Sequence, residues 1–292
     1  FLSRFAEPVT KVGEGMVKST IEIFNTIIES LLPTPAKSHY TFNLRDLAKV
    51  FQGVLMGEPK KITEQPQILR LWVHELKRVF EDRLISVEDH EWFVEMLKKQ
   101  LLKHFGAEWN VVVPLPRLIY GDYMEPGADP KIYEEVDNLE NLQSTIIEYL
   151  NDHNQMSKSP MPLVMFLDAI EHVSRVSRII RQPQGNALLL GVGGSGRQSM
   201  TKLATFIAGY QLFQVEISKG YGMVEWREDI RKALLSAGVK DKPTTFLFSD
   251  VQIVMEQMLE DINNILTAGD VPNLYGPEEM DAIITSCRVE CE

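Results

Sequence analysis

A glycine-rich stretch in the second half of the chain carries the residue types that bind phosphate. Four glycines fall within six positions: Gly191, Gly193, Gly194 and Gly196. The apolar run at 187–190 predicts a short buried strand before them, and a helical pattern follows at 200–208. Glycines let backbone amides converge on an anion, and a helix N-terminus adds unsatisfied donors and a positive dipole end. Strand, glycine loop and helix in this order predict a phosphate-binding loop.

The loop departs from the P-loop pattern G-x-x-x-x-G-K-[ST] in its last two positions. Arg197 stands where a lysine reaches the β/γ-phosphates, and Gln198 stands where a hydroxyl holds Mg²⁺. Arginine pairs with phosphate through a planar fork. Ser199 comes one residue late, which turns it by about 100° on a helix. We expect nine consecutive residues to bind the nucleotide: Gly191, Val192, Gly193, Gly194, Ser195, Gly196, Arg197, Gln198 and Ser199.

The same glycines also satisfy G-x-G-x-x-G, the pattern of dinucleotide-binding folds. Glu216 follows 20 residues after Gly196, at the end of a predicted strand, where such folds keep a carboxylate for a ribose hydroxyl. Spacing alone favours the mononucleotide P-loop only slightly. Arg197 favours it further, because a P-loop requires a cation at this point and a dinucleotide-binding loop does not. Asp250 favours it as well, because it ends the later predicted strand at 245–248, where P-loop proteins place the Mg²⁺-organising Asp.

Asp250 is therefore the expected metal ligand, and we assign no catalytic residue. Val251 follows it at the position where an active member of the class carries a catalytic glutamate. Valine cannot polarise a water molecule, so we expect a nucleotide to bind without rapid hydrolysis. Other acidic residues of the second half are interpreted as helix-surface groups: Glu228, Asp229, Glu256, Glu260 and Asp261.

Length, charge and cysteine content limit the class of protein. The 292 residues predict about two domains, and a formal net charge of −11 argues against nucleic acid or an anionic membrane as a partner. No apolar run is long enough to span a membrane. Cys287 and Cys291 are interpreted as free thiols in a reducing compartment. Residues 1–4 have no signal-peptide pattern. The missing initial Met and the abrupt ending at Cys291-Glu292 predict a piece of a longer chain.

The hydrophobic pattern divides the chain into three parts. Residues 1–105 contain only helical periodicity, 106–138 are irregular, and 139–292 alternate strands with helices. We therefore predict an α/β fold with a parallel sheet covered by helices on both faces, preceded by an all-helical domain. The predicted helices are 8–32, 44–56, 66–80, 86–104, 139–150, 163–180, 197–209, 226–237, 254–266 and 278–289, and the predicted strands are 187–190, 212–217 and 245–248.

Several segments resemble the fourth AAA+ module of a dynein heavy chain of the axonemal type. They are DAIEHV at 168–173, GNALLLGVGGSGRQS at 185–199, FLFSD at 246–250, LEDINN at 259–264 and VPNL at 271–274. Upstream, LPTPAKSHY at 32–40 and FNLRD at 42–46 resemble the small helical domain that closes the third module. This resemblance covers nearly the whole chain and favours the P-loop over the dinucleotide interpretation.

The resemblance implies a segment of a microtubule motor powered by a ring of six AAA+ modules. Residues 1–105 would be the lid of module three, 106–138 a linking segment, and 139–292 an incomplete P-loop large domain of module four. The implied ligands are ATP or ADP with Mg²⁺, and Arg45 matches the lid arginine that reaches the nucleotide of module three. The implied location is the cytoplasm and the cytoskeleton of the cilium axoneme.

The implied partners are neighbouring AAA+ modules, other dynein chains, and the microtubule through a stalk outside this chain. Cytoplasmic members of the family carry Lys-Thr and Asp-Glu at the two nucleotide motifs of this module. The chain instead has Arg197-Gln198 and Asp250-Val251, which fits the axonemal type and implies weak or absent hydrolysis. The alternative is a purely structural ring segment with a vestigial loop.

Overall fold

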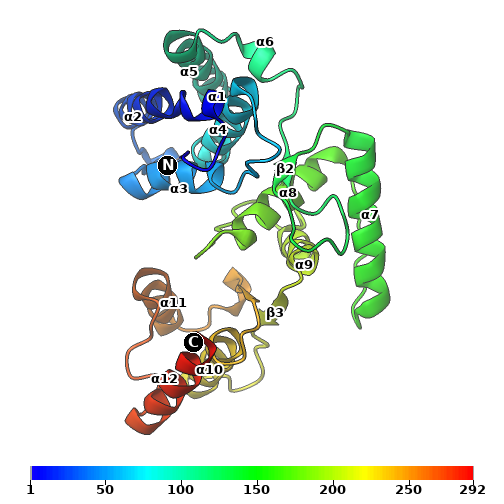
Figure 1. Cartoon of the computed structure of the whole chain (residues 1–292). Coiled ribbons are helices and arrows are strands. Elements are labelled where there is room, and N and C mark those ends of the chain that lie inside the picture. The colour runs from blue at the N-terminus through cyan, green and yellow to red at the C-terminus, as the bar shows by residue number, and fades with distance from the viewer. Residues whose placement is uncertain (1, 292) are drawn as a thin grey trace. The chain divides into compact units, whose positions relative to one another are not determined.

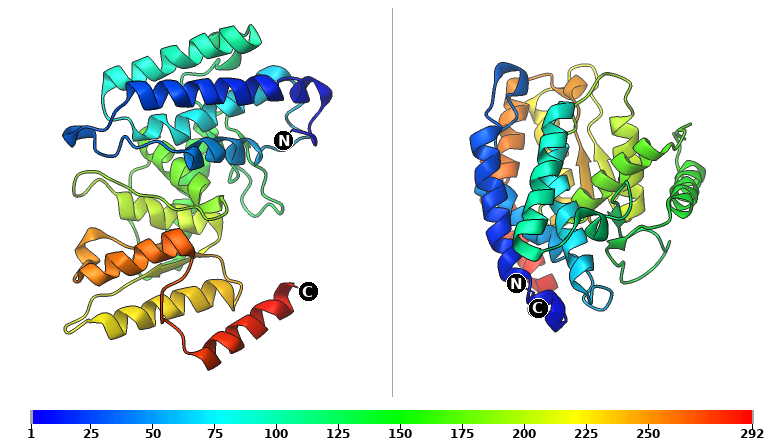
Figure 2. Two further views of the ribbon diagram at one scale, coloured as in Figure 1. Left: turned by 90° about the vertical axis from the view of Figure 1, so that its left-hand side faces the viewer. Right: turned by 90° about the horizontal axis from the view of Figure 1, so that it is seen from above.

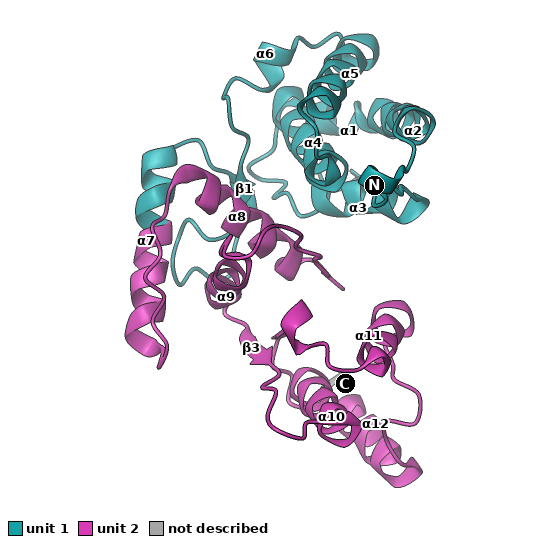
Figure 3. Cartoon of the chain, turned by 180° about the vertical axis from the view of Figure 1, so that it is seen from behind, with its two compact units in different colours: residues 1–145 teal, residues 146–292 magenta. Residues whose placement is uncertain are grey.

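The computed structural model describes the backbone of residues 2–291 and the side chains of residues 2–288. The chain forms two compact units, Phe1–Thr145 and Ile146–Glu292 (Figure 3). The division falls inside one helix, α7 (Leu139–Met156). Among the described helices, none combines the length and the apolar character needed to cross a lipid bilayer.

The first unit is built mainly of helices around α4 (Figure 1). Six apolar side chains of α4 are fully buried, and one of them, Trp72, donates from Nε1 to Thr20 Oγ1 of α2 at 2.9 Å. Figure 2 shows α2 and α5 running side by side. The helices are α1 (Glu7–Thr10), α2 (Gly13–Ser30), α3 (Leu44–Val54), α4 (Gln65–Val79), α5 (Val87–Phe105) and α6 (Trp109–Val112), with short turns η1 (Pro35–Lys37) and η2 (Glu81–Arg83).

The single helix predicted over 8–32 is wrong at its start, because α1 and α2 are separate helices. Gly13 and Gly15 follow the break, and glycine is a poor helix former. A Cβ at Gly15 would lie 3.0 Å from the ring of Phe105, so this glycine also lets α5 pack closely on α2.

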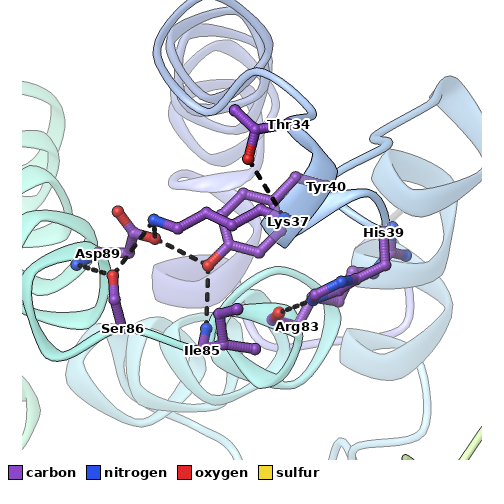
Figure 4. A network of polar contacts seen from close by, with 8 residues as sticks. All are labelled: Thr34, Lys37, His39, Tyr40, Arg83, Ile85, Ser86 and Asp89. Carbon is purple, nitrogen blue, oxygen red and sulfur yellow. Dashed lines mark hydrogen bonds and ion pairs between the residues drawn. The ribbon is translucent and has the colours of Figure 1, made fainter.

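A polar network holds the turn between α2 and α3 against the start of α5 (Figure 4). Tyr40 Oη donates to Asp89 Oδ2 at 2.8 Å and accepts from the amide of Ile85 at 2.9 Å. Lys37 pairs with the same Asp89 carboxylate, and Ser86 caps α5 by accepting from the Asp89 amide at 3.3 Å. The turn that leads into α3 is therefore tied to a neighbouring helix.

The segment 106–138 contains two short strands, β1 (Tyr120–Gly121) and β2 (Glu134–Glu135), which pair antiparallel. Tyr120 is buried and its ring lies 4.8 Å from that of His74. Burial raises the pKa of the Tyr120 hydroxyl far above its usual range.

The second unit holds the predicted strand–helix alternation, but its sheet has only two described strands. β3 (Gln211–Gln214) pairs parallel with β4 (Thr244–Leu247), in the register Gln211↔Thr244 to Gln214↔Leu247. Beneath them lies a core that includes Val215, Trp226 and Met258. The other elements are α8 (Leu167–Arg181), α9 (Arg197–Ala208), α10 (Met223–Gly238), η3 (Asp250–Gln252), α11 (Glu256–Ala268) and α12 (Pro277–Cys291).

The buried strand predicted at 187–190 is wrong. Leu188 and Leu190 are 83% and 70% exposed, and this stretch pairs with no strand among the described residues. A strand needs a neighbour to complete its backbone hydrogen bonds, so an apolar run alone does not make one. The helix predicted to end at 150 continues to Met156, and the next helix begins at Leu167 instead of 163. Cys287 is a free thiol, and the side chain of Cys291 lies outside the described residues.

Gly53 allows α3 to lie directly on a buried carboxylate of α4. A Cβ at Gly53 would lie 1.7 Å from Glu75 Oε2, and Glu75 is fully buried. We expect Gly53→Ala to lower the free energy of unfolding by about 1–3 kcal/mol, because a rigid core cannot accept the added methyl group. Chemical denaturation followed by circular dichroism measures this change.

Gly238→Ala is the matched control, since a Cβ there meets nothing within 4 Å. Alanine in that helix should raise stability by about 0.5–1 kcal/mol. Equal effects of the two substitutions would contradict the close α3–α4 approach.

Glu22 joins α2 to α5 through three donors. Its Oε2 accepts from Lys103 Nζ at 2.7 Å, His104 Nε2 at 3.1 Å and Gln100 Nε2 at 3.2 Å. The hydrogen bond from Lys103, followed by that from His104, lowers the pKa of Glu22 to about 2. Because the pKa of Glu22 is lower in the folded chain than in the unfolded chain, the ionised carboxylate stabilises the fold at pH values above 4.5. This stabilisation is lost as the pH falls from 4.5 towards 2.

We expect Glu22→Gln to reduce the unfolding free energy at pH 7 by up to about 1 kcal/mol, since Glu22 is partly exposed. The variant should also lose less stability than the parent when the pH falls from 4.5 towards 2. Urea unfolding at several pH values measures both effects. Glu29→Gln, on the same helix, is the control, and a pH profile unchanged by Glu22→Gln would refute the role of this carboxylate.

Candidate functional site

The glycine loop ends at the first residue of α9, and two of its glycines need their backbone freedom. Gly194 and Gly196 have φ values of 79° and 77°, in the left-handed region that side chains with a Cβ rarely adopt. Gly196 is the N-cap of α9. The chain therefore turns sharply from the loop into the helix at two glycines.

The start of α9 presents backbone donors without an internal acceptor. The first intrahelical bond runs from Met200 N to Gly196 O at 2.8 Å, and no side chain caps the helix. Within the described residues, the amides of Arg197, Gln198 and Ser199 therefore have no helical partner. A Cβ at Gly193 would meet nothing within 4 Å, so the loop is open at this glycine. Free donors, a helix N-terminus and open space form a cradle that fits an anion.

Arg197 lies within this loop. Its guanidinium donates from Nη1 to Leu189 O at 3.4 Å and from Nη2 to Val192 O at 3.2 Å. A Cβ on Gly191 would approach Arg197 Cδ to 3.6 Å. The structure thus brings together the predicted loop and its predicted cation. The side chains of Gln198 and Ser199 form no hydrogen bond among the described residues.

Asp250 lies in η3, after the end of β4, as predicted from its position behind an apolar run. It is exposed, and its Oδ1 accepts from the amide of Val251 at 3.0 Å. No hydrogen bond or ion pair joins it to the glycine loop among the described residues. Val251 is 78% exposed, and so the position behind Asp250 carries an apolar side chain facing solvent.

The described residues contain no group of three acidic, cysteine or histidine side chains that could hold a metal alone. A single exposed carboxylate is still enough for Mg²⁺ that arrives with a nucleotide, because Mg²⁺ commonly binds through one or two carboxylates together with the phosphates of its substrate. Asp250 is such a carboxylate.

Aromatic packing supports β4 from below. Trp226 of α10 lies 5.2 Å from Phe248 and 6.3 Å from Phe246, measured between ring centroids. Its Nε1 donates to Asp261 Oδ2 of α11 at 2.9 Å. The interpretation of Asp261 as a helix-surface acid is therefore wrong, since it is only 5% exposed. The position of Asp261 along α11 does not predict this burial, because the tryptophan that it binds comes from another helix.

Arg45 lies in the first unit, at the start of α3. Its side chain is exposed, and its amide donates to Asn43 Oδ1 at 2.9 Å in a capping box with Asp46. The predicted site residues therefore fall into a loop group and a separate Asp250 in one unit, with Arg45 in the other.

Two family models match the two units. Residues 161–292 match the P-loop containing dynein motor region D4, and residues 16–111 match the AAA+ lid domain. The chain is 53% identical over 283 residues to dynein axonemal heavy chain 1 of Mus musculus and 47% identical over 291 residues to dynein axonemal heavy chain 6 of Homo sapiens. These alignments cover 97% and 99% of this chain. The chain belongs to the axonemal dynein heavy chain family.

This dynein chain spans about 7% of the length of the curated relatives it matches. It contains an AAA+ lid domain followed by a P-loop region of the dynein motor ring, so the predicted fold class is confirmed. The P-loop match also decides between the two interpretations of the glycines. Glu216, the acid on which the dinucleotide alternative depended, is exposed and forms no hydrogen bond or ion pair among the described residues.

Proposed function

We propose that residues 191–199 bind the phosphates of ATP or ADP. The observation that supports this most directly is the uncapped N-terminus of α9, which joins a glycine loop and leaves backbone donors free. A helix N-terminus of this kind attracts negative charge through both its amides and its dipole. Arg197 adds a full positive charge at the same place, and a guanidinium can form charge-assisted hydrogen bonds with phosphate oxygens.

Asp250 is the proposed ligand of the Mg²⁺ that accompanies the nucleotide. Bound Mg²⁺ supplies neutralisation of phosphate charge. Gln198 would be a weak substitute for the usual hydroxyl ligand. Asp250 and the phosphates therefore carry most of the metal binding in this proposal.

Bound nucleotide should turn over slowly or not at all in this module. A water molecule needs a base to become a nucleophile, and Val251 occupies the position of the catalytic carboxylate. We therefore propose a regulatory or structural role, in which the occupied site stabilises one arrangement of the ring. Differential affinity for nucleotide between two arrangements is what such regulation requires.

In the whole motor we propose that residues 1–105 are the lid of module three, 106–138 a linking segment, and 139–292 part of the large domain of module four. Arg45 would then reach the nucleotide of module three. The parent protein would move along microtubules in the cilium axoneme, through a stalk outside this chain and with other dynein chains.

A purely structural role for the loop is the second candidate. It is favoured by the hydrogen bonds that Arg197 donates to Leu189 O and Val192 O, because these stabilise the loop from within. The loop would then keep its shape without any ligand.

We expect MgATP or MgADP to bind the 292-residue chain in isothermal titration calorimetry, and Arg197→Ala to weaken that binding. The loss should be about 10- to 100-fold, as for about 1.5–3 kcal/mol of charge-assisted hydrogen bonding. Lys202→Ala removes the same charge further along α9 and serves as the matched control, with little expected effect. No heat of binding at millimolar nucleotide would overturn the proposal and favour the structural role.

Asp250→Asn should remove most of the Mg²⁺ dependence of nucleotide affinity while leaving binding in EDTA nearly unchanged. Asparagine keeps the shape of the side chain but not its charge, so the change isolates the metal contact. Fluorescence titration with a labelled ADP, with and without Mg²⁺, measures the two affinities. Asp241→Asn is the control, since Asp241 is exposed in a left-handed conformation that asparagine tolerates. A variant at Asp250 that keeps the full Mg²⁺ effect would remove Asp250 from the site.

A further inference from the structure

A buried glutamine closes the carboxyl ends of β3 and β4. Gln252, the last residue of η3, is only 6% exposed. Its Oε1 accepts from the Ser249 amide at 2.7 Å and from Ser249 Oγ at 3.0 Å. Its Nε2 donates to the backbone carbonyl of Val215. One side-chain amide thus joins the end of one strand to the end of the other.

The atoms that Gln252 joins are those of the next rung of the parallel ladder. Gln211 N donates to Pro243 O at 2.8 Å, outside the start of β4. Hydrogen bonding in a parallel pair repeats at every second residue of a strand. If the ladder continued in the observed register, its next hydrogen bond would run from Ser249 N as donor to Val215 O as acceptor. The Gln252 amide lies between these two atoms, accepting from one and donating to the other.

The inserted amide separates the two strand ends without leaving a polar group unpaired. A side-chain amide carries both a donor and an acceptor, so it replaces a direct backbone bond with two bonds in series. The strands therefore stay linked but diverge immediately before Asp250. Ligands of open α/β folds bind outside the carboxyl ends of the strands, at the edge where this divergence occurs.

The turn that carries Asp250 is closed by two backbone hydrogen bonds, one of them from the same glutamine. The Gln252 amide donates to Ser249 O at 2.9 Å, and the Ile253 amide donates to Asp250 O at 3.1 Å. We infer that Gln252 is a positioning residue for Asp250: its side-chain amide fixes the strand ends and the η3 turn, and so holds in place the carboxylate that would bind Mg²⁺. This inference depends on the proposed role of Asp250 as the metal ligand.

The test compares labelled-ADP affinity with Mg²⁺ and with EDTA in the 292-residue chain. Gln252→Met keeps the length of the side chain but forms neither hydrogen bond. Without these bonds the η3 turn no longer holds Asp250 in place, so most of the Mg²⁺ effect should disappear while the EDTA affinity stays the same. A role in folding alone would lower both affinities together, and that result would overturn the inference.

Gln252→Glu is the second variant, because it keeps an acceptor for Ser249 but no donor for Val215 O. Gln252→Glu should lose the Mg²⁺ effect as Gln252→Met does. In a separate hydrogen-exchange measurement, the Ser249 amide should exchange faster with solvent in Gln252→Met than in the parent. If Gln252→Met does not fold, the glutamate variant decides. If Asp250→Asn removes the Mg²⁺ effect but the Gln252 variants retain it, this inference is overturned and the proposed role of Asp250 stands. A parent chain with no nucleotide binding overturns the proposed function instead.

Discussion

The site depends on a helix that begins with unpaired backbone donors. Helix α9 begins at a glycine, and no side chain caps its first amides. The left-handed conformations of Gly194 and Gly196 make this entry possible, because a Cβ at either position would be strained. The same glycines leave the loop without side chains over its amides. An anion is the natural partner of such an arrangement, and the only cation in the loop lies beside it.

The two departures from an active nucleotide site affect different steps. Arg197 keeps the charge of the usual lysine but donates to two carbonyls of its own loop, so binding a phosphate requires it to exchange partners. Val251 leaves the position behind Asp250 without a base. In the proposed function the first change would tune nucleotide affinity and the second would suppress hydrolysis.

The position of Asp250 depends on contacts that no motif contains. Trp226 packs below Phe248 and is itself anchored by a buried hydrogen bond to Asp261. Gln252 links the strand ends above. These residues come from α10, α11 and η3, so they meet only when the second unit has folded. Their roles were missed because each looks like an ordinary helix or turn residue in its own segment.

Local chemistry in the amino-acid order was enough to predict most helices, both paired strands, the glycine loop before α9 and the place of Asp250 behind β4. Glycine spacing, helix caps such as Asn43 and Ser86, and apolar periodicity act over a few residues, so they can be recognised without the fold. Burial and pairing act between distant segments. Folding alone left 187–190 unpaired, placed Asp261 in the core and inserted the Gln252 amide between two strands, because each outcome depends on which partner lies opposite.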